Sequence, residues 1–483
     1  MQYRAIIRIL GLLVALFSVT MVPPALVSLI YQDGGGLPFV LAFILCLLTG
    51  TAFWYPNRTH KSDLRAKEGF LIVVLFWTVL ASFGAIPFAL LEQPQMSITD
   101  SFFESFSGLT TTGATVIEGI EFLPHAVKFY RQQLQWLGGM GIIVLAVAIL
   151  PILGVGGMQL YRAETPGPVK DSKMTPRIAD TAKHLWFIYL GLTIACSLAY
   201  WLAGMTLFDA ICHAFSTIAI GGFSTYDASL GYFQSPLVNV ICVVFLWIAA
   251  LNFALHYAAV SARSLQNYRH DPEFKAFFFI QAALISVCFL TLVLSNYYRS
   301  AEVALDQAML QAVSISTTAG FTTTDFSAWP AFLPILLIFS SFIGGCAGST
   351  GGGLKVIRVF LLYLQGKREI DRLVHPKAIY SVKLGDRAMP DRVVEAVWGF
   401  FSAYAIVFVI IMIGLISTGL DNITAFTATA ATLNNLGPGL GEVSSTFASV
   451  NDPGKWLLIL AMLFGRLEVF SLLVLFSPTF WRG

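Results

Sequence analysis

The sequence contains few charged residues. Asp, Glu, Lys and Arg make up only 12% of its 483 residues, against about 25% in soluble domains. A soluble globule of this length could not cover its surface with so few charges, so an ordinary cytosolic protein is excluded. Basic and acidic residues nearly balance, at 29 and 27, and this balance gives no indication of nucleic-acid binding.

The sequence also lacks the cysteine and histidine patterns of metal sites and disulfide frameworks. Its six cysteines are scattered singly, and none forms a C-x-x-C motif. We therefore expect buried free thiols, with neither a disulfide framework nor a zinc site. His213 and His256 are isolated in apolar surroundings and are interpreted as core residues.

Apolar residues are abundant instead. Residues of the AVILMFWYC set make up 57% of the chain, and the mean hydropathy is +0.75. Ten stretches are long enough to cross a bilayer, which takes about 20 residues each. They lie near residues 6–31, 37–55, 69–92, 129–153, 184–205, 234–261, 275–297, 331–365, 393–419 and 456–480. The chain is therefore predicted to be a polytopic membrane protein whose first span is retained rather than removed as a signal peptide.

The distribution of basic residues predicts the orientation. With the N-terminus in the cytoplasm, 24 Lys and Arg residues fall in inward-facing segments and only 4 in outward-facing ones, Lys128 and Arg131 among the latter. Because cytoplasmic loops carry the excess of basic residues, both termini are expected to be cytoplasmic. The basic region 354–392 is then a large cytoplasmic surface.

Four shorter apolar segments lie between pairs of spans, near 97–109, 208–218, 306–317 and 422–433. They are too short to span a bilayer, and each ends in a glycine-centred turn, which is typical of a re-entrant helix. Thirteen residues before each central glycine is Asp100, Asp209, Gln307 or Thr424, and an Asp or Thr there is expected to cap the helix. All four segments fall on the predicted outer side.

The four segments divide the chain into repeats. Each copy reads span, short helix, glycine turn, span, and each begins and ends on the cytoplasmic side, so the copies are parallel rather than inverted as in LeuT-type carriers. The predicted fold is an all-α membrane protein with ten transmembrane helices and four re-entrant pore helices. The predicted units are a two-span N-terminal unit at 1–56 and pore repeats at 57–160, 161–263, 264–370 and 371–483.

Such a unit is the building block of a potassium-channel pore. Ion filters need backbone carbonyls around a water-filled axis, and glycine permits the backbone angles that aim successive carbonyls the same way. The C-terminal dipole ends of the short helices would favour a cation. The predicted filter residues, which bind K⁺ as the transported ion, are Thr111, Thr112, Gly113, Ile220, Gly221, Gly222, Thr318, Ala319, Gly320, Asn435, Leu436 and Gly437.

The turns depart from a strict potassium-channel filter in one respect. A T-V-G-Y-G filter has a second glycine two residues after the first, but here Thr115, Ser224 and Thr322 take that place, and only Gly439 keeps it. We therefore expect fewer well-formed ion sites and a modest discrimination of K⁺ over Na⁺. Because Ile220 and Leu436 carry apolar side chains, ion contacts in those turns are expected to be mainly through the backbone.

Long motifs throughout the chain resemble the Trk/Ktr/HKT superfamily of potassium transporters, and most closely the membrane subunits of bacterial Trk potassium uptake systems. The motifs are FESFSGLTTTGA at 103–114, AIGGFST at 219–225, TTAGFTT at 317–323, FIGGCAGSTGGGLK at 342–355, LNNLGPGLG at 433–441 and MLFGRLEVF at 462–470. The resemblance implies a pore of four non-identical units in one chain, a homodimer, and a cytoplasmic nucleotide-binding regulatory subunit of the TrkA type. It also implies location in the bacterial cytoplasmic (inner) membrane and no bound cofactor.

The span predicted at 331–365 is too long for one crossing and is interrupted at 344–353, where six of ten residues are glycine. Each glycine costs a helix roughly 1 kcal/mol relative to alanine, so a continuous helix is not expected. One interpretation is helix packing through Gly344 and Gly348. The other, which the resemblance implies, is a gating loop just inside the filter, and its predicted residues are Gly344, Gly345, Gly348, Ser349, Thr350, Gly351, Gly352, Gly353 and, with them, Arg466.

Arg466 is predicted to lie in the middle of the last span. A guanidinium at membrane depth normally faces a cavity or a partner, so Arg466 either pairs with a carboxylate on another helix or faces the pore below the filter. The resemblance supports the second interpretation. Glu468, two residues on, cannot pair with it as a helix neighbour.

Ion permeation is therefore the predicted function. The alternative is a potassium symporter coupled to H⁺ or Na⁺, which would need intramembrane carboxylates or histidines; Glu468 is the only carboxylate predicted deep in a span. An enzyme is not expected, because the chain has no H-E-x-x-H motif and no complete G-x-S-x-G motif.

Overall fold

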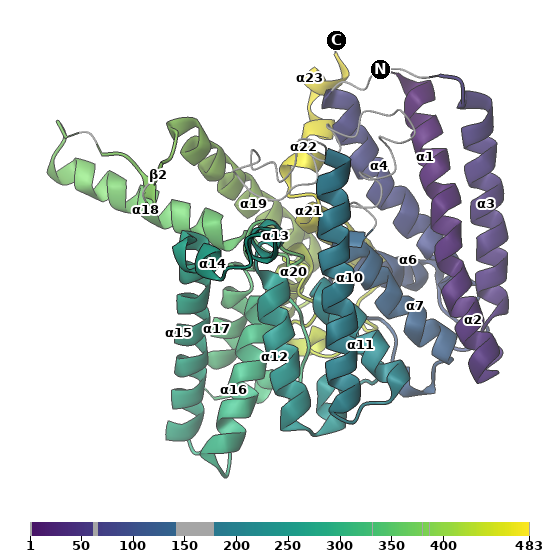
Figure 1. Cartoon of the computed structure of the whole chain (residues 1–483), viewed down its shortest axis with the longest axis horizontal. Coiled ribbons are helices and arrows are strands. Elements are labelled where there is room, and N and C mark those ends of the chain that lie inside the picture. The colour runs from purple at the N-terminus through teal and green to yellow at the C-terminus, as the bar shows by residue number, and fades with distance from the viewer. Residues whose placement is uncertain are drawn as a thin grey trace.

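The structure is a computed structural model that describes residues 2–60, 66–141, 178–330, 332–378, 380–385 and 387–482. It is almost entirely helical, and a two-stranded hairpin of β1 (Lys383–Leu384) and β2 (Arg387–Ala388) is the only sheet among the described residues. The chain begins and ends at the same end of the molecule, as the N and C marks of Figure 1 show. All six cysteines are buried and free, as the sequence predicts.

Within the described residues, six helical segments are long and apolar enough to cross a membrane, and they match predicted spans. They are formed by α1 (Tyr3–Ser18) with α2 (Val22–Tyr31), α3 (Leu37–Asn57), α4 (Ala66–Gly84) with α5 (Ile86–Ala89), α10 (Ile178–Leu202), α15 (Pro272–Leu294) and α19 (Asp391–Ser417). Only 22% of the most apolar window of α3 is buried inside the chain. The rest of α3 therefore forms an apolar outer surface of the kind that lipid covers.

Two predicted spans are bent helix pairs rather than continuous helices. In the segment at 234–261, α12 (Pro236–Ala250) and α13 (Phe253–Ala262) meet at 92°, because Leu251 is extended and Asn252 caps the second helix. In the segment at 456–480, α21 (Asp452–Arg466) and α22 (Phe470–Phe476) meet at 114°, where Glu468 and Val469 have positive φ. The short α23 (Pro478–Trp481) follows. The sequence analysis did not anticipate either bend.

The span predicted at 331–365 is also interrupted, as the sequence predicts. The glycine-rich stretch separates α17 (Leu333–Ser340) from α18 (Val356–Val374). The span predicted at 129–153 is described only up to residue 141, as α7 (His125–Trp136) and a π-helical turn (Leu137–Gly141). The remainder of that span and the loop that follows it, up to residue 177, lie outside the described residues.

The four predicted short helices are all present. They are α6 (Ile98–Leu109), α11 (Leu207–Ala219), α16 (Ala301–Ser316) and α20 (Asn422–Leu433). Figure 1 shows α11 beside α10, and α16 beside α12 and α15. Connecting helices are α14 (Gln266–His270) and short 3₁₀ turns.

The caps of these helices differ from the prediction. Ser97, Thr206, Ser300 and Asp421 accept hydrogen bonds from the first-turn amides. In the first two copies the predicted aspartate lies three residues later and accepts a hydrogen bond from the cap hydroxyl, at 2.8 Å for Asp100 and 2.7 Å for Asp209. This arrangement resembles a capping box, in which the cap residue and an acidic residue three positions later act together. The sequence-based prediction assigned the cap to the acidic residue instead of to the Ser or Thr before it.

Candidate ion pathway

Each of the four short helices ends in the same turn. The residue two before the central glycine has a left-handed conformation, with φ of 57° at Thr111, 54° at Ile220, 69° at Thr318 and 54° at Asn435. The amide of the next residue bonds to a helix carbonyl five positions earlier, at 2.9, 2.8, 2.7 and 2.7 Å in the four copies. This pair of features is a Schellman motif, which closes a helix and redirects the chain sharply.

The left-handed residues are strained. Glycine or asparagine normally occupies such a position, whereas a β-branched residue there is an outlier that costs roughly 1–2 kcal/mol. Thr111, Ile220 and Thr318 are all β-branched. Such strain persists where the surrounding structure over-determines the backbone, and it is concentrated at functional sites.

The central glycines bring the four turns into a closed ring. A β-carbon built on Gly113 would lie 2.1 Å from the carbonyl oxygen of Gly221, and one on Gly222 would lie 2.0 Å from that of Ala319. A β-carbon on Gly320 would lie 2.2 Å from the carbonyl oxygen of Leu436. The ring closes where a β-carbon on Gly437 would lie 2.8 Å from that of Thr112.

Each turn therefore meets the next at the residue before its glycine, in chain order and back to the first. All twelve predicted filter residues belong to these turns. The spacing leaves no room for a side chain at any of the four central positions, because contacts under 3.0 Å at a β-carbon force the backbone apart.

Side-chain hydrogen bonds also hold the turns of the ring in place. Asn435 donates to the hydroxyl of Thr112 at 2.9 Å and so links the fourth turn to the first. Gln135 on α7 donates to the carbonyl of Gly221 at 2.5 Å and accepts from the amide of Phe223 at 3.1 Å. The side chains of Ile220 and Leu436 are fully buried.

The glycine-rich segment lies against the C-terminal ends of three short helices. Thr350 donates to the carbonyl of Ile218 in α11 at 2.9 Å, and the amide of Gly352 donates to the hydroxyl of Thr318 at 2.7 Å. The amide of Gly353 donates to the carbonyl of Asn434, beyond α20, at 3.1 Å. A packing role for Gly344 is also visible, because a β-carbon there would lie 2.1 Å from the carbonyl oxygen of Gly352.

Arg466 joins this segment to the remaining short helix. Its guanidinium donates to the hydroxyl of Thr111 at 3.3 Å and to the carbonyls of Thr350 at 3.4 Å and Gly139 at 2.8 Å, and also to Gly138. Together, the segment and Arg466 contact the end of each of the four short helices.

Arg466 is the last residue of α21, and the helix breaks directly after it. Glu468 lies in that break and pairs with Arg358 of α18 at 2.6 Å. The guanidinium of Arg358 also lies 4.1 Å from the ring centroid of Phe400. The break in the last span is thus held to the helix that follows the glycine-rich segment.

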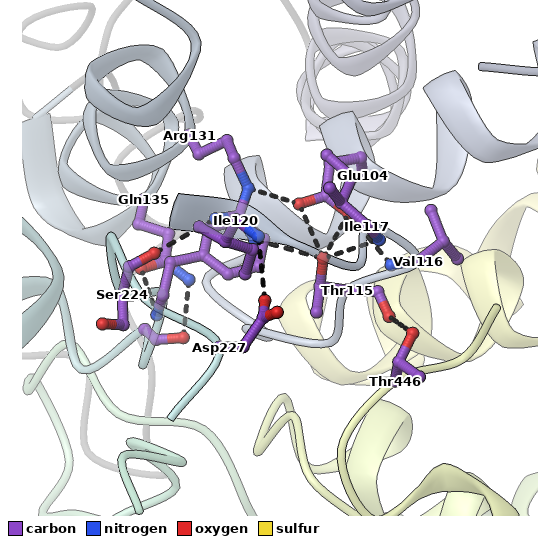
Figure 2. A network of polar contacts seen from close by, with 12 residues as sticks. Glu104, Thr115, Val116, Ile117, Ile120, Arg131, Gln135, Ser224, Asp227 and Thr446 are labelled. Atoms are coloured by element: carbon purple, nitrogen blue, oxygen red, sulfur yellow. Dashed lines mark hydrogen bonds and ion pairs between the residues drawn. The ribbon is translucent and has the colours of Figure 1, made fainter. Parts of the chain in front are cut away.

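Sequence analysis missed a buried ion pair behind the turns. Glu104 on α6 and Arg131 on α7 are both fully buried, and their side chains meet at 2.7 Å (Figure 2). The sequence predicts Arg131 on the outer side and Glu468 as the only carboxylate deep in a span, and neither prediction anticipates this pair.

The repeat spacing could have revealed these residues. Glu104 lies nine residues before Gly113, and the same spacing gives His213 in the second copy and Gln311 in the third. His213 is fully buried, as predicted, and its Nε2 lies 2.9 Å from the hydroxyl of Ser224. Gln311 donates to the carbonyl of Thr324 at 3.0 Å. Each polar side chain therefore supports the outgoing limb of its own turn.

Known proteins resemble this chain in sequence and in fold. The family model TrkH, described as cation transport protein, matches residues 36–482. The chain is 67% identical to the Trk system potassium uptake protein TrkH of Vibrio parahaemolyticus over the whole length of both. It is 41% identical to the Trk system potassium uptake protein TrkG of Escherichia coli, over 99% of each chain.

A solved structure shows the same fold. The crystal structure of the potassium transporter TrkH from Vibrio parahaemolyticus superimposes with a TM-score of 0.92 at 64% sequence identity, and the match covers all of both chains.

Proposed function

The chain belongs to the TrkH family of cation transport proteins, and we propose that it takes up potassium ions across the cytoplasmic membrane through a channel-like pore. The substrate follows from its full-length relatives, which are named as potassium uptake proteins rather than as enzymes. The transported K⁺ is the substrate, and no resident cofactor is proposed.

The closed ring of four turns is the observation that carries this proposal. Backbone carbonyls that replace an ion's hydration shell must surround one axis, and a ring in which Gly113, Gly222, Gly320 and Gly437 each contact the neighbouring turn places four backbones around such an axis. The C-terminal ends of the four short helices each carry roughly half a negative charge. We propose that these ends face the ion path and favour a monovalent cation.

We further propose the repeat organisation predicted from the sequence. A two-span unit at 1–56 would precede four parallel repeats, at 57–160, 161–263, 264–370 and 371–483. The identical Schellman turns in four copies support this division. The common end at which the two termini lie supports the proposed cytoplasmic location of both (Figure 1).

We propose that the glycine-rich segment gates the pore from the inner side of the ring. Its hydrogen bonds run to Ile218, Thr318 and Asn434, at the helix ends where the ion path would continue. Hydrogen bonds to backbone amides and hydroxyls are individually worth about 0.5–1.5 kcal/mol, so the segment can be displaced without unfolding its surroundings. Arg466, bonded to Thr350, would place a positive charge at the same level.

Coupled symport with H⁺ or Na⁺ remains the second candidate. The buried Glu104 is the kind of intramembrane carboxylate that proton coupling requires, but it is ion-paired with Arg131 and accepts further hydrogen bonds. Because the oxygens of this carboxylate are already engaged by Arg131, Thr115 and the amide of Val116, we favour uncoupled permeation.

Uptake into sealed vesicles tests both candidates. The purified protein reconstituted in liposomes should pass K⁺ down its gradient at a rate that a pH gradient or external Na⁺ leaves unchanged beyond the effect of the membrane potential. A rate that follows the pH gradient at clamped potential would establish H⁺ coupling, and a requirement for Na⁺ would establish Na⁺ coupling.

We also propose a homodimer and a cytoplasmic nucleotide-binding subunit of the TrkA type as partners. The names of the relatives place them in a multi-part uptake system, the Trk system. The basic region 354–392, with its exposed helix α18, offers the predicted cytoplasmic docking surface.

A further inference from the structure

We propose that Glu104 and Arg131 form a positioning pair that fixes the outgoing limbs of the first and second turns and thereby sets the discrimination of K⁺ over Na⁺. This inference rests on the proposed function, because it concerns the same four turns. The pair lies behind the turns rather than on the ion path. Figure 2 shows Glu104 and Arg131 beside Thr115 and Ser224.

The first turn is held by a closed network. The hydroxyl of Thr115 lies 3.1 and 3.0 Å from the two carboxylate oxygens of Glu104 and accepts from Arg131 Nη2 at 3.1 Å. Arg131 Nε completes the triangle with its 2.7 Å contact to Glu104. The carboxylate also accepts from the amide of Val116 at 3.2 Å. The limb at 115–116 is thus bonded through both its side chain and its backbone.

The same arginine reaches the second turn. Arg131 Nη1 donates to the carbonyl of Ser224 at 3.1 Å, and its guanidinium carbon lies 4.2 Å from the ring centroid of Phe223. One guanidinium therefore ties together two limbs that are more than 100 residues apart in sequence. These are the two turns that meet where Gly113 contacts the carbonyl of Gly221.

A second link supports the same boundary. Asp227, just beyond Ser224, accepts from the amides of Gly119 at 2.8 Å and Ile120 at 3.0 Å (Figure 2). The outer ends of the two limbs are therefore joined independently of Arg131. Loss of Arg131 should change the spacing of the limbs locally without separating the turns.

The pair contacts residues at one particular position of the filter motif. Thr115 and Ser224 stand where a strict potassium-channel filter has its second glycine, as the sequence shows. Replacing a buried ion pair by apolar residues is often neutral or stabilising, so stability alone does not account for two fully buried charges here. Functional groups must be held to within about 0.5 Å of their productive geometry by supporting residues, and a rigid guanidinium whose three nitrogens each have a different partner provides such support.

The support is unequal around the ring. Nine residues before Gly437 the fourth copy has Ala428, which has no polar side-chain atom. There the hydroxyl of Thr427 accepts from the amide of Leu440 at 3.0 Å. Charged support is found behind the first two turns, whereas the third copy has the neutral Gln311 and the fourth copy, which retains Gly439, has only a hydroxyl.

The cleanest test changes the hydroxyl that joins the pair to the first turn. Thr115→Val removes the hydroxyl but leaves the Glu104–Arg131 contact intact, whereas Thr115→Ser keeps the hydroxyl. Each variant is reconstituted in liposomes, and the K⁺ and Na⁺ fluxes are measured at equal gradients. Thr115→Val should lower the K⁺/Na⁺ flux ratio about two- to tenfold, the factor that one lost hydrogen bond implies, and Thr115→Ser should retain the ratio.

A double variant tests the pair itself. Arg131→Gln alone leaves a buried carboxylate unpaired and is expected to destabilise the fold, but Glu104→Gln with Arg131→Gln leaves no buried charge. The double variant should fold and show the lowered ratio. The control is Lys455→Gln, which breaks the half-buried contact of Lys455 with Asp100 at 2.7 Å without removing a partner of Glu104 or Arg131. It should lower the melting temperature without changing the ratio.

The outcomes separate this inference from the proposed function. An unchanged ratio in Thr115→Val, or in the folded double variant, overturns the positioning role. Gly113→Ala is measured in the same assay: if it too leaves the ratio unchanged, the ring itself is not the filter, and the proposed function fails with it. If Gly113→Ala lowers the ratio while Thr115→Val does not, only the positioning pair is refuted.

Discussion

Gly113 lies so close to the carbonyl oxygen of Gly221 that a β-carbon on Gly113 would be 2.1 Å from it. Gly113→Ala must therefore displace the neighbouring turn by more than an ångström or unwind its own turn, whose φ is 80°. We expect this variant to lose most K⁺ uptake or to conduct K⁺ and Na⁺ almost equally. Uptake in a potassium-deficient host and flux in liposomes would measure the two effects.

A matched control separates the steric contact from backbone strain. Gly34 has a similar φ of 72°, but a β-carbon there would meet nothing within 4 Å. Gly34→Ala carries a comparable cost for a left-handed alanine, about 1 kcal/mol, without any collision. Uptake and the flux ratio should remain normal in Gly34→Ala. Equal defects in the two variants would attribute the effect to backbone strain and contradict the ring.

The hydroxyl of Thr318 holds the glycine-rich segment against the third turn through the amide of Gly352, at 2.7 Å. Thr318→Val leaves that buried amide without this partner, which costs roughly 1–3 kcal/mol, and should shift the segment toward a displaced state. We expect a higher K⁺ flux in the variant and a slightly lower melting temperature. Thr318→Ser keeps the hydroxyl and should behave as the parent protein does. A Thr318→Val protein with lowered stability and unchanged flux would argue that the contact only packs the segment.

The ends of the glycine-rich segment are adjacent, because a β-carbon on Gly353 would lie 2.9 Å from the Cα of Gly344. Residues 345–352 can therefore be deleted with little strain at the junction. The deletion should raise cation flux, since it removes the hydrogen bonds to Ile218 and Thr318 that hold material below the ring. Flux and melting temperature are to be measured on the same preparation. A folded deletion protein with parental flux would favour helix packing as the role of this segment.

Local sequence signals predicted the long helices and the four short ones because these depend on apolar length and on glycine at a helix end. The helix breaks at Leu251 and Glu468 could not be predicted from local sequence signals. No proline or glycine cluster marks them, and each break is stabilised by a distant partner: the amide of Phe253 bonds to the carbonyl of Gly348, and Glu468 bonds to Arg358. Tertiary contacts of this kind override local propensity.

The candidate site likewise has a part that the sequence predicts and a part that it does not. The turns could be predicted from the sequence because four copies repeat one pattern. The pairing of Glu104 with Arg131 could not, since the sequence predicts Arg131 on the outer side and only the fold buries it. The spacing of nine residues before each central glycine was the available signal, and it becomes visible only after the copies are aligned.

The last prediction concerns Arg466. Its two interpretations, a charge that faces the ion path and a partner of a buried carboxylate, predict different changes in K⁺ flux when the residue is replaced. Its guanidinium donates to Thr111 and to the carbonyl of Thr350, at 3.3 and 3.4 Å, so it lies at the junction of the first turn and the glycine-rich segment. If its charge faces the ion path, Arg466→Ala lowers the barrier to a passing cation and also releases Thr350. K⁺ flux and Na⁺ leak should then both rise in a folded protein.

Arg466→Lys keeps the charge but not the several donors of the guanidinium. It should therefore retain most of the barrier and show a flux between those of the parent and of Arg466→Ala. If Arg466 instead balances a buried carboxylate, its loss leaves that charge unpaired at a cost of about 3–5 kcal/mol, and the melting temperature falls steeply while flux does not rise. Measuring flux and melting temperature on the same purified variants distinguishes these results, and a stable Arg466→Ala protein with reduced conductance would refute the barrier role.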